Sequence, residues 1–226
     1  MTLPGVTLVM DAAAGNGTIA VLRDGVLVVE ADVVMRSAAE ERFFPAVQDT
    51  LARAGATLAD LRQLVVGAGP GSFTALRVVG AIAKGIAQAR DIPMYAVPSL
   101  ALTAGGARTV VTLDALRGER YAALVERDAD GRVQRVEQLG LWPAAEVDAR
   151  AAALQATPLA ADATVPSQAA PLAGDVATAL HARNAVACAA LAIAAGPVDL
   201  ARWEPMYGRL AEAQVKWEAA HGRPLA

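Results

Sequence analysis

The chain has 226 residues, a formal net charge of -3 and a hydrophobic content of 55%. This length suffices for one ordinary domain or two small lobes with a real core, and the composition excludes a disordered or fibrous chain. Lys and Arg form no cluster or stripe, which gives little support to direct nucleic-acid binding. The only cysteine, Cys188, excludes an internal disulfide and any multi-cysteine metal site, and His181 and His221 lie in no metal-ligand spacing.

The N-terminal sequence lacks the basic segment and apolar stretch that a signal peptide needs. The longest uncharged stretch, Ala185 to Val198, is too short to span a bilayer and ends in a Gly-Pro pair. We therefore expect a cytoplasmic protein without a membrane segment, in which this stretch forms a buried helix.

The first 97 residues predict three strands followed by units that alternate helix and strand. Short apolar runs separated by Gly- and Asp-containing turns predict the strands. A capping box formed by Ser37 and Glu40 predicts the start of the first helix, and Thr57 caps a short turn or helix after it. The expected strands are 6–10, 18–22, 26–34, 64–67 and 92–97, and the expected helices are 38–54 and 73–89.

This order of elements is typical of ribonuclease-H-like and actin-like lobes and differs from a doubly wound Rossmann sheet. Strands expected at 109–113, 120–127 and 132–139 repeat the three-stranded opening, whereas residues 142–186 are rich in Ala and Pro and show little periodicity. We therefore predict an α/β protein of the actin-like, ribonuclease-H-like (ASKHA) fold, with two lobes. The predicted division is an N-terminal lobe over 1–104 and a smaller, degenerate lobe with a C-terminal helix over 105–226.

A glycine-rich turn, with three glycines from Gly67 to Gly71, joins an apolar strand to the second long helix. Such a turn leaves the first N–H groups of the helix free, so it suits either a phosphate or a partner chain. A dinucleotide fingerprint fails because Ser72 occupies the position of its third glycine. A P-loop fails because no Gly-Lys-Ser/Thr follows the glycines, and Lys84 lies deep in the helix.

Asp11 and Asp114 each end an apolar strand at the start of an expected lobe. Actin-like ATPases place at these points the carboxylates that organise magnesium around ATP phosphates. The other interpretation is that each Asp caps a turn through its own backbone, which strand-terminal Asp residues commonly do. Three alanines follow Asp11 and offer a phosphate no hydroxyl, so we treat both positions as degenerate phosphate-motif positions and predict no catalytic or metal-binding residues.

The two long helices carry apolar stripes that are candidates for a partner or dimer interface. Phe43 and Phe44 differ by about 100° around the helix axis, so one of them is expected to face outward. Small residues on the second helix permit close approach of another helix, although ordinary core packing also explains both stripes. The candidate interface residues are Phe43, Phe44, Val47 and Leu51 on the first helix and Phe73, Leu76, Val79, Gly80 and Ala83 on the second.

The segment from Gly69 to Arg77, Gly-Pro-Gly-Ser-Phe-Thr-Ala-Leu-Arg, resembles the signature of the TsaB (YeaZ-like) family of bacterial tRNA threonylcarbamoyladenosine biosynthesis. The chain departs from the family at Ala12 and Ala13, which replace Thr and Ser, and at Ala75, which replaces Gly. The motif positions of the turn are Gly69, Gly71, Ser72, Thr74 and Arg77, with further matches at 83–87, 98–100, 114–121 and 205–209.

The resemblance implies a non-catalytic accessory subunit that binds and activates TsaD, with TsaE as a third, ATP-hydrolysing component. The complex transfers threonylcarbamoyl to the adenosine beside the anticodon of tRNAs that read codons beginning with A. It implies that the same two helices form either a homodimer or the contact with TsaD, and that this chain meets tRNA only indirectly. It implies no cofactor of its own, and leaves open ATP or ADP at the complex interface.

An alternative function follows from the residues alone. Asp11, Asp114 and the glycine-rich turn together are compatible with a small actin-like, ATP-dependent phosphotransferase that acts by itself. No Ser/His/Asp arrangement forms by spacing, so the sequence does not support an independent hydrolase.

Overall fold

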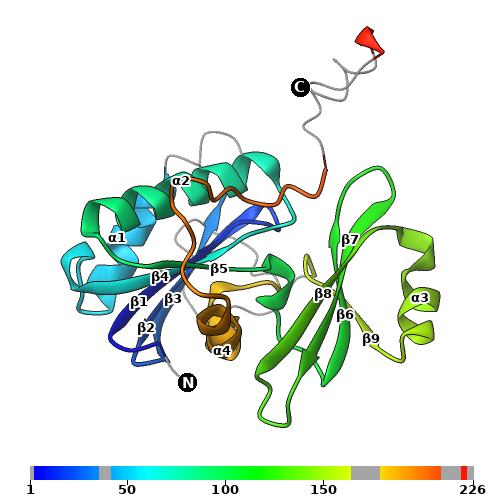
Figure 1. Ribbon diagram of the computed structural model, residues 1–226, viewed down its shortest axis with the longest axis horizontal. Coiled ribbons are helices and arrows are strands. Elements are labelled where there is room, and N and C mark those ends of the chain that lie inside the picture. The colour runs from blue at the N-terminus through cyan, green and yellow to red at the C-terminus, as the bar shows by residue number, and fades with distance from the viewer. Residues whose placement is uncertain (1–2, 36–41, 164–178, 210–219, 223–226) are drawn as a thin grey trace.

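Two β-sheets lie next to each other in the structure, a computed structural model that describes residues 3–35, 42–163, 179–209 and 220–222 (Figure 1). Helices α1 (Phe43–Arg53) and α2 (Phe73–Arg90) lie over one face of the first sheet. The capping box of Ser37 and Glu40 and the expected helix start at Ala38 fall outside the described residues.

The first sheet has the strand order β3-β2-β1-β4-β5. The first three strands pair antiparallel, while β4 pairs parallel with β1 and β5 pairs parallel with β4. Tight turns fold the first three strands into a meander, whereas helices provide the crossovers to the parallel strands. The strands are β1 (Val6–Asp11), β2 (Asn16–Arg23), β3 (Val26–Val34), β4 (Leu61–Gly67) and β5 (Met94–Val97), so the predicted order is confirmed.

The two helices bury their apolar stripes against this sheet. In α1 the stripe of Phe43, Val47 and Leu51 is fully buried, and in α2 Val79 and Ala83 lie in the same hydrophobic cluster as the apolar side chains of β1 and β4. Between the helices, Thr57 caps a short 3-10 helix (Leu58–Asp60) with a complete capping box, as predicted.

The second sheet has the order β8-β7-β6-β9 and repeats the first four strands of the first sheet. Again the first strand of the set pairs antiparallel with the second and parallel with the fourth. Its elements are β6 (Arg108–Asp114), β7 (Glu119–Arg127), β8 (Val133–Pro143), α3 (Val147–Ala153) and β9 (Thr157–Ala160). The repeat establishes the two-lobed actin-like fold, while the domain division at residue 104 stays a prediction.

Helix α4 (Ala185–Ala195) packs at the junction of the sheets and contacts both β5 and β8 (Figure 1). The helix buries Cys188, and this burial raises the pKa of the thiol to about 12. Gly196, with φ of 78°, ends the helix, as the Gly-Pro pair predicted. Among the described helices, none is long and apolar enough to cross a membrane.

Phe43 and Phe44 provide a matched test of this packing. The Phe43 ring is 0% exposed and lies against Gly17 of β2, whereas Phe44 is 37% exposed. Phe43→Ala should lower the free energy of unfolding by about 3–4 kcal/mol, because it leaves a cavity in the core. Phe44→Ala should cost about 1 kcal/mol or less in the same urea titration. Equal losses would contradict the assignment of Phe43 to the core.

Candidate functional site

The glycine-rich turn between β4 and α2 packs against the backbone on both sides. A Cβ atom on Gly71 would overlap the carbonyl oxygen of Ala13, and a Cβ atom on Gly69, whose φ is 90°, would overlap that of Met206. The Ser72 N–H donates to the Ala13 carbonyl over 2.9 Å, and the Met206 N–H donates to the Ala68 carbonyl over 2.6 Å. These glycines therefore permit close contact with other segments of the same chain.

The carboxylate of Asp11 lies directly behind this turn and is 0% exposed. Its Oδ1 accepts the Ala13 N–H over 2.8 Å, and its Oδ2 accepts the hydroxyl of Ser99. The Ser99 Oγ in turn accepts the Gly69 N–H over 2.8 Å. A Cβ atom on Gly67 would overlap Asp11 Oδ2, so the absence of a side chain there makes room for the carboxylate.

Burial raises the pKa of Asp11 to about 6. The hydrogen bonds from Ser99 and the Ala13 N–H, and the electrostatic interaction with His181, lower this pKa but do not offset the burial. The carboxylate is enclosed and both of its oxygens have protein partners. Asp11 is therefore bound by its own turn and by Ser99, and offers no exposed oxygen to a magnesium ion.

Asp114, at the matching position of the second sheet, makes the same kind of turn. Its Oδ1 accepts the Leu116 N–H over 2.8 Å, two residues ahead, as Asp11 does with Ala13. Its side chain is exposed at the end of β6. Both strand-terminal aspartates thus cap their own turns, which is the second of the two interpretations of the sequence, and they give no support to the phosphotransferase alternative.

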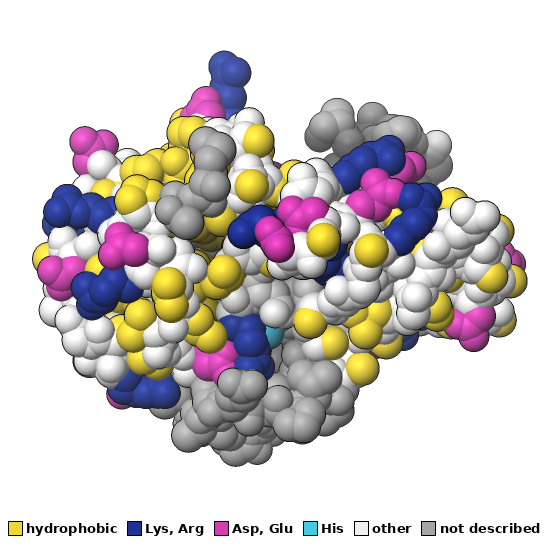
Figure 2. All heavy atoms as spheres, turned by 90° about the horizontal axis from the view of Figure 1, so that it is seen from below, with side chains coloured by type: hydrophobic (Ala, Val, Ile, Leu, Met, Phe, Trp, Pro, Cys, Tyr) yellow, Lys and Arg dark blue, Asp and Glu magenta, His cyan; other side chains and the backbone are white. Residues whose placement is uncertain are grey.

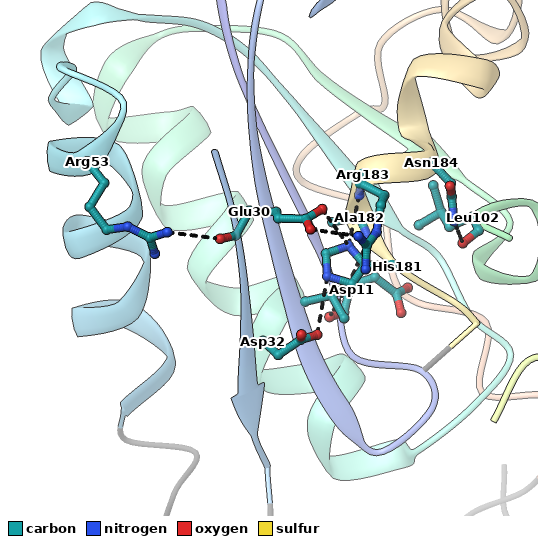
Figure 3. Close-up of polar contacts among 10 residues, drawn as sticks. Asp11, Glu30, Asp32, Arg53, Leu102, His181, Ala182, Arg183 and Asn184 are labelled. Carbon is teal, nitrogen blue, oxygen red and sulfur yellow. Dashed lines mark hydrogen bonds and ion pairs between the residues drawn. The ribbon is translucent and has the colours of Figure 1, made fainter. Parts of the chain in front are cut away.

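A buried polar cluster lies beside Asp11 (Figure 3). His181 is 1% exposed; its Nε2 lies 3.2 Å from Asp32 Oδ1, and its Nδ1 accepts the Arg183 N–H over 3.1 Å. The Arg183 guanidinium lies 2.6 Å from a carboxylate oxygen of Glu30. The cluster thus places two carboxylates beside one imidazole and one guanidinium.

This cluster fastens the segment before α4 to the first sheet. The Ala182 N–H donates to Thr18 Oγ1 over 3.0 Å, and the His181 N–H donates to the Leu102 carbonyl over 2.8 Å. Sequence reasoning treated His181 as isolated and missed the cluster. The sequence feature that could have indicated the cluster is the pair Glu30 and Asp32. These two acidic residues lie on the same face of a strand that is otherwise apolar at that end. In the described part of the chain, no group of three His, Cys, Asp or Glu residues could hold a metal ion.

The structure shows how far the candidate interface residues of the two helices are exposed in this chain. Six of them have buried side chains and pack in the core, so their part in a partner interface stays a prediction. Gly80 faces Trp203 and Pro205 of this chain, each with a ring atom 3.3 Å from the position that a Cβ atom on Gly80 would take. Only Phe44 and Phe73 are exposed, each at 37%. The buried six are Phe43, Val47, Leu51, Leu76, Val79 and Ala83.

Of the turn's motif positions, Arg77 packs on the interface candidate Phe73, with the guanidinium 5.2 Å from the ring centre. The Ser72 side chain makes no capping hydrogen bond to α2. The structure thus explains Gly69, Gly71 and the Ser72 backbone by contacts within the chain, while the outcome for Thr74 and Arg77 as functional positions stays a prediction.

An apolar groove between α1 and α2 is the open surface of this region. It has a volume of about 360 Å³. Phe44 contributes the α1 wall, and Gly85 contributes a floor where a side chain would meet only open space. The lining residues are Phe44, Leu58, Ile82, Gly85, Ile86, Ala89 and Arg90.

Charged side chains of both signs are mixed on the underside of the molecule. Lys and Arg side chains lie among Asp and Glu side chains there, without a large patch of one sign on the face in view (Figure 2). The α1–α2 groove differs from this face, because its lining is mainly apolar.

These observations define the class of protein as a two-lobed actin-like α/β protein. Its strand-terminal aspartates accept hydrogen bonds from their own turns, and its first lobe carries an open apolar groove. Residues 34–194 match the family model described as TsaD, tRNA N6-adenosine threonylcarbamoyltransferase. Two solved structures from Pseudomonas aeruginosa superpose with a TM-score of 0.65 each. One is YeaZ, at 24% identity over 89% of this chain and 99% of that one, and the other is described as similar to peptidase YeaZ, at 25% identity over 90% and 99%.

Curated relatives carry the name tRNA threonylcarbamoyladenosine biosynthesis protein TsaB. The Escherichia coli (strain K12) protein is 35% identical over 131 residues, which cover 55% of this chain and 56% of that protein. The Bacillus subtilis (strain 168) protein is 33% identical over 124 residues, which cover 53% and 54%. The chain thus aligns with about half the length of these relatives. It belongs to the TsaB (YeaZ-like) family.

The raised pKa of Asp11 predicts a specific pH dependence of stability. The folded-state value of about 6 lies above the ordinary 3.8, so the folded protein binds this proton more tightly than the unfolded chain. The contribution of this proton to stability is full below pH 3.8 and is lost as the pH rises through 6. From pH 4 to pH 7, the free energy of unfolding should fall by about 2 kcal/mol more in the unsubstituted chain than in Asp11→Asn.

Urea titrations at a series of pH values would measure this difference. Asp114→Asn is the matched control, because it removes an exposed carboxylate with the same turn hydrogen bond. A pH dependence that is lost in Asp11→Asn and kept in Asp114→Asn would be assigned to Asp11. Parallel profiles for all three proteins would show that Asp11 does not bind a proton more tightly on folding.

Substitutions at Gly71 and Gly85 compare a glycine in close contact with backbone and a glycine beside open space. Gly71→Ala should destabilise the protein by about 1–3 kcal/mol, because its methyl group would overlap the Ala13 backbone, which cannot swing aside like a side chain. Gly85→Ala should be neutral or stabilising by up to about 1 kcal/mol, because Gly85 lies inside α2 with open space beside it. Urea midpoints measure both, and a neutral Gly71→Ala would contradict the close contact.

Proposed function

We propose that this chain is a cytoplasmic, non-catalytic accessory subunit that binds TsaD and activates its transfer of threonylcarbamoyl to the adenosine beside the anticodon. The tRNAs concerned are those that read codons beginning with A. The single observation that carries the proposal is the open apolar groove between α1 and α2 in a member of the TsaB family. An apolar groove with one exposed aromatic at its wall suits the apolar face of a partner helix.

The bonding of the groups at the expected positions supports a non-catalytic role. Asp11 and Asp114 both bind their own turns, and Ser99 is 0% exposed with its hydroxyl donated to Asp11. We therefore assign the chemistry to TsaD, the ATP hydrolysis to TsaE, and any bound ATP or ADP to the interface between subunits. Contact with tRNA is then indirect, through the complex.

The same groove would serve a homodimer, because two copies can place α1 and α2 against each other around a two-fold axis. Homodimer and TsaD complex then compete for one surface. Added TsaD should convert dimers of this chain into heterodimers, which size-exclusion chromatography with light scattering would detect.

Binding to the TsaD of the same organism tests the proposal directly. Phe44→Asp should weaken the complex by roughly 100-fold or more in isothermal titration calorimetry, because it places a charge in an apolar interface. The fold should survive, since Phe44 is partly exposed. Leu116→Asp is the control, because Leu116 is 69% exposed on the hairpin between β6 and β7, outside the groove.

A second measurement addresses the activity. In cells that contain only Phe44→Asp, threonylcarbamoyladenosine in tRNA should fall in parallel with the lost complex, while Leu116→Asp should keep it. Normal modification in cells without this chain, or no binding of the unsubstituted chain to TsaD, would overturn the proposal.

A further inference from the structure

The chain after α4 turns back over the first lobe and then reaches the second (Figure 1). The Val198 N–H donates to the Met94 carbonyl over 2.9 Å, at the start of β5. Further on, the Met206 N–H donates to the Ala68 carbonyl over 2.6 Å, directly after β4. Residues 203–209, which we call the strap, lie beyond the first of these anchors and contain the second.

The strap covers a strip of α2 that runs along one side of the helix. Trp203 and Pro205 lie over Gly80, and Lys84 Nζ donates to the Trp203 carbonyl over 3.0 Å. Positions 73, 77, 80 and 84 are spaced at helical intervals and share this side. The groove residues Ile82, Gly85 and Ala89 lie on a different side of the same helix.

The other end of the strap contacts β7 of the second sheet. The Tyr207 ring lies 4.5 Å from that of Phe73, centre to centre, and the hydroxyl of Tyr121 donates to the Tyr207 carbonyl over 3.2 Å. Beyond it, Arg209 forms an ion pair with Glu119. The strap thus links the first turn of α2 to the start of β7.

The bonds that close the strap are few and partly exposed. The Arg209 side chain is 24% exposed and that of Glu119 is 42% exposed, and Met206 is 44% exposed. In contrast, the strands beneath it pair in continuous ladders with buried side chains. Trp203 and Tyr207 add apolar contacts with the two cores, but both side chains are only partly buried. A segment held by these contacts, isolated hydrogen bonds and one partly exposed ion pair opens at a lower free energy than the continuous sheets that it crosses.

We propose that residues 203–209 are a releasable strap, closed by the Glu119–Arg209 ion pair and the Tyr207 contacts, which covers the Phe73–Gly80–Lys84 strip of α2. When the strap is closed, Gly80 is buried beneath Trp203 and Pro205, and a partner cannot contact it. When it opens, the covered strip, with Gly80 at its centre, becomes a second face of the helix. The inference concerns the isolated chain and does not rest on the proposed function.

Residue-resolved amide hydrogen exchange of the full chain tests this device. The reporter is the Met206 N–H, which exchanges only when the strap leaves the Ala68 carbonyl. Glu119→Arg and Arg209→Glu should each speed its exchange by roughly three- to ten-fold, because each places like charges in contact. Tyr207→Ala should speed it by a similar factor or more. The double variant with both charges exchanged should return it to near the rate of the unsubstituted chain.

Two internal references separate strap opening from general unfolding. The Val198 N–H lies before the strap, and the amides of β4 and β5 report on the first sheet, so all of these should keep their rates. Arg135→Glu is the matched control, because its partners, Glu137 on β8 and Glu126 near the end of β7, lie in ion pairs that do not involve the strap. It should leave the Met206 rate unchanged.

The proposal is overturned if Met206 exchanges at the same rate as the sheet amides in the unsubstituted chain, since the strap would then open only with the whole fold. It is also overturned if the single charge variants do not change the Met206 rate, or if the double variant fails to restore it. Fluorine NMR of the chain labelled with 5-fluorotryptophan gives a second readout, because the Trp203 signal should shift in the single variants and return in the double variant.

Discussion

The buried carboxylate of Asp11 is the constraint on which the centre of the first lobe depends. A charge that is 0% exposed requires hydrogen bonds, and three nearby features supply or permit them. Ser99 donates to one oxygen and the Ala13 N–H to the other, while Gly67 lacks the side chain that would overlap the carboxylate. Because Ser99 also accepts the Gly69 N–H, the same bonds fix the glycine-rich turn. One buried acid thus couples β1, β4 and the segment after β5.

This coupling changes the meaning of the glycine-rich motif. A glycine-rich turn before a helix suggests a phosphate cradle, because free N–H groups point outward. Here Gly71 brings the turn against Ala13, and Gly69 brings it against Met206, so the space beside the glycines is filled by the chain itself. The motif is therefore a packing junction from which α2 starts, and its sequence is specific because backbone segments meet there at close range.

The sequence predicted the elements whose signals are local and missed what depends on distant partners. Strand alternation and helical stripes were sufficient for the first sheet and for α1 and α2, whereas α3 and β9 lie in an Ala- and Pro-rich stretch with no clear period. The sequence predicted that one of Phe43 and Phe44 faces outward, but not which one; the structure shows that it is Phe44. An apolar stripe looks the same in sequence whether it meets a sheet or a partner, so only the structure could show that Phe43 packs on the sheet. The cluster of Glu30 and His181 joins residues about 150 positions apart, and no sequence spacing records it.

The three sides of α2 explain how one helix can serve a core, a strap and a partner at once. Val79 and Ala83 pack on the sheet, Gly80 and Lys84 meet residues 203–205, and Ile82, Gly85 and Ala89 line the groove. A small residue is needed at Gly80, where Trp203 and Pro205 approach the helix closely, whereas Gly85 has open space beside it. A substitution on this helix therefore acts through the side on which it falls. Ala83 bears on stability, Gly80 on the strap and Gly85 on the surface left open to a partner, although all three belong to one short apolar stretch.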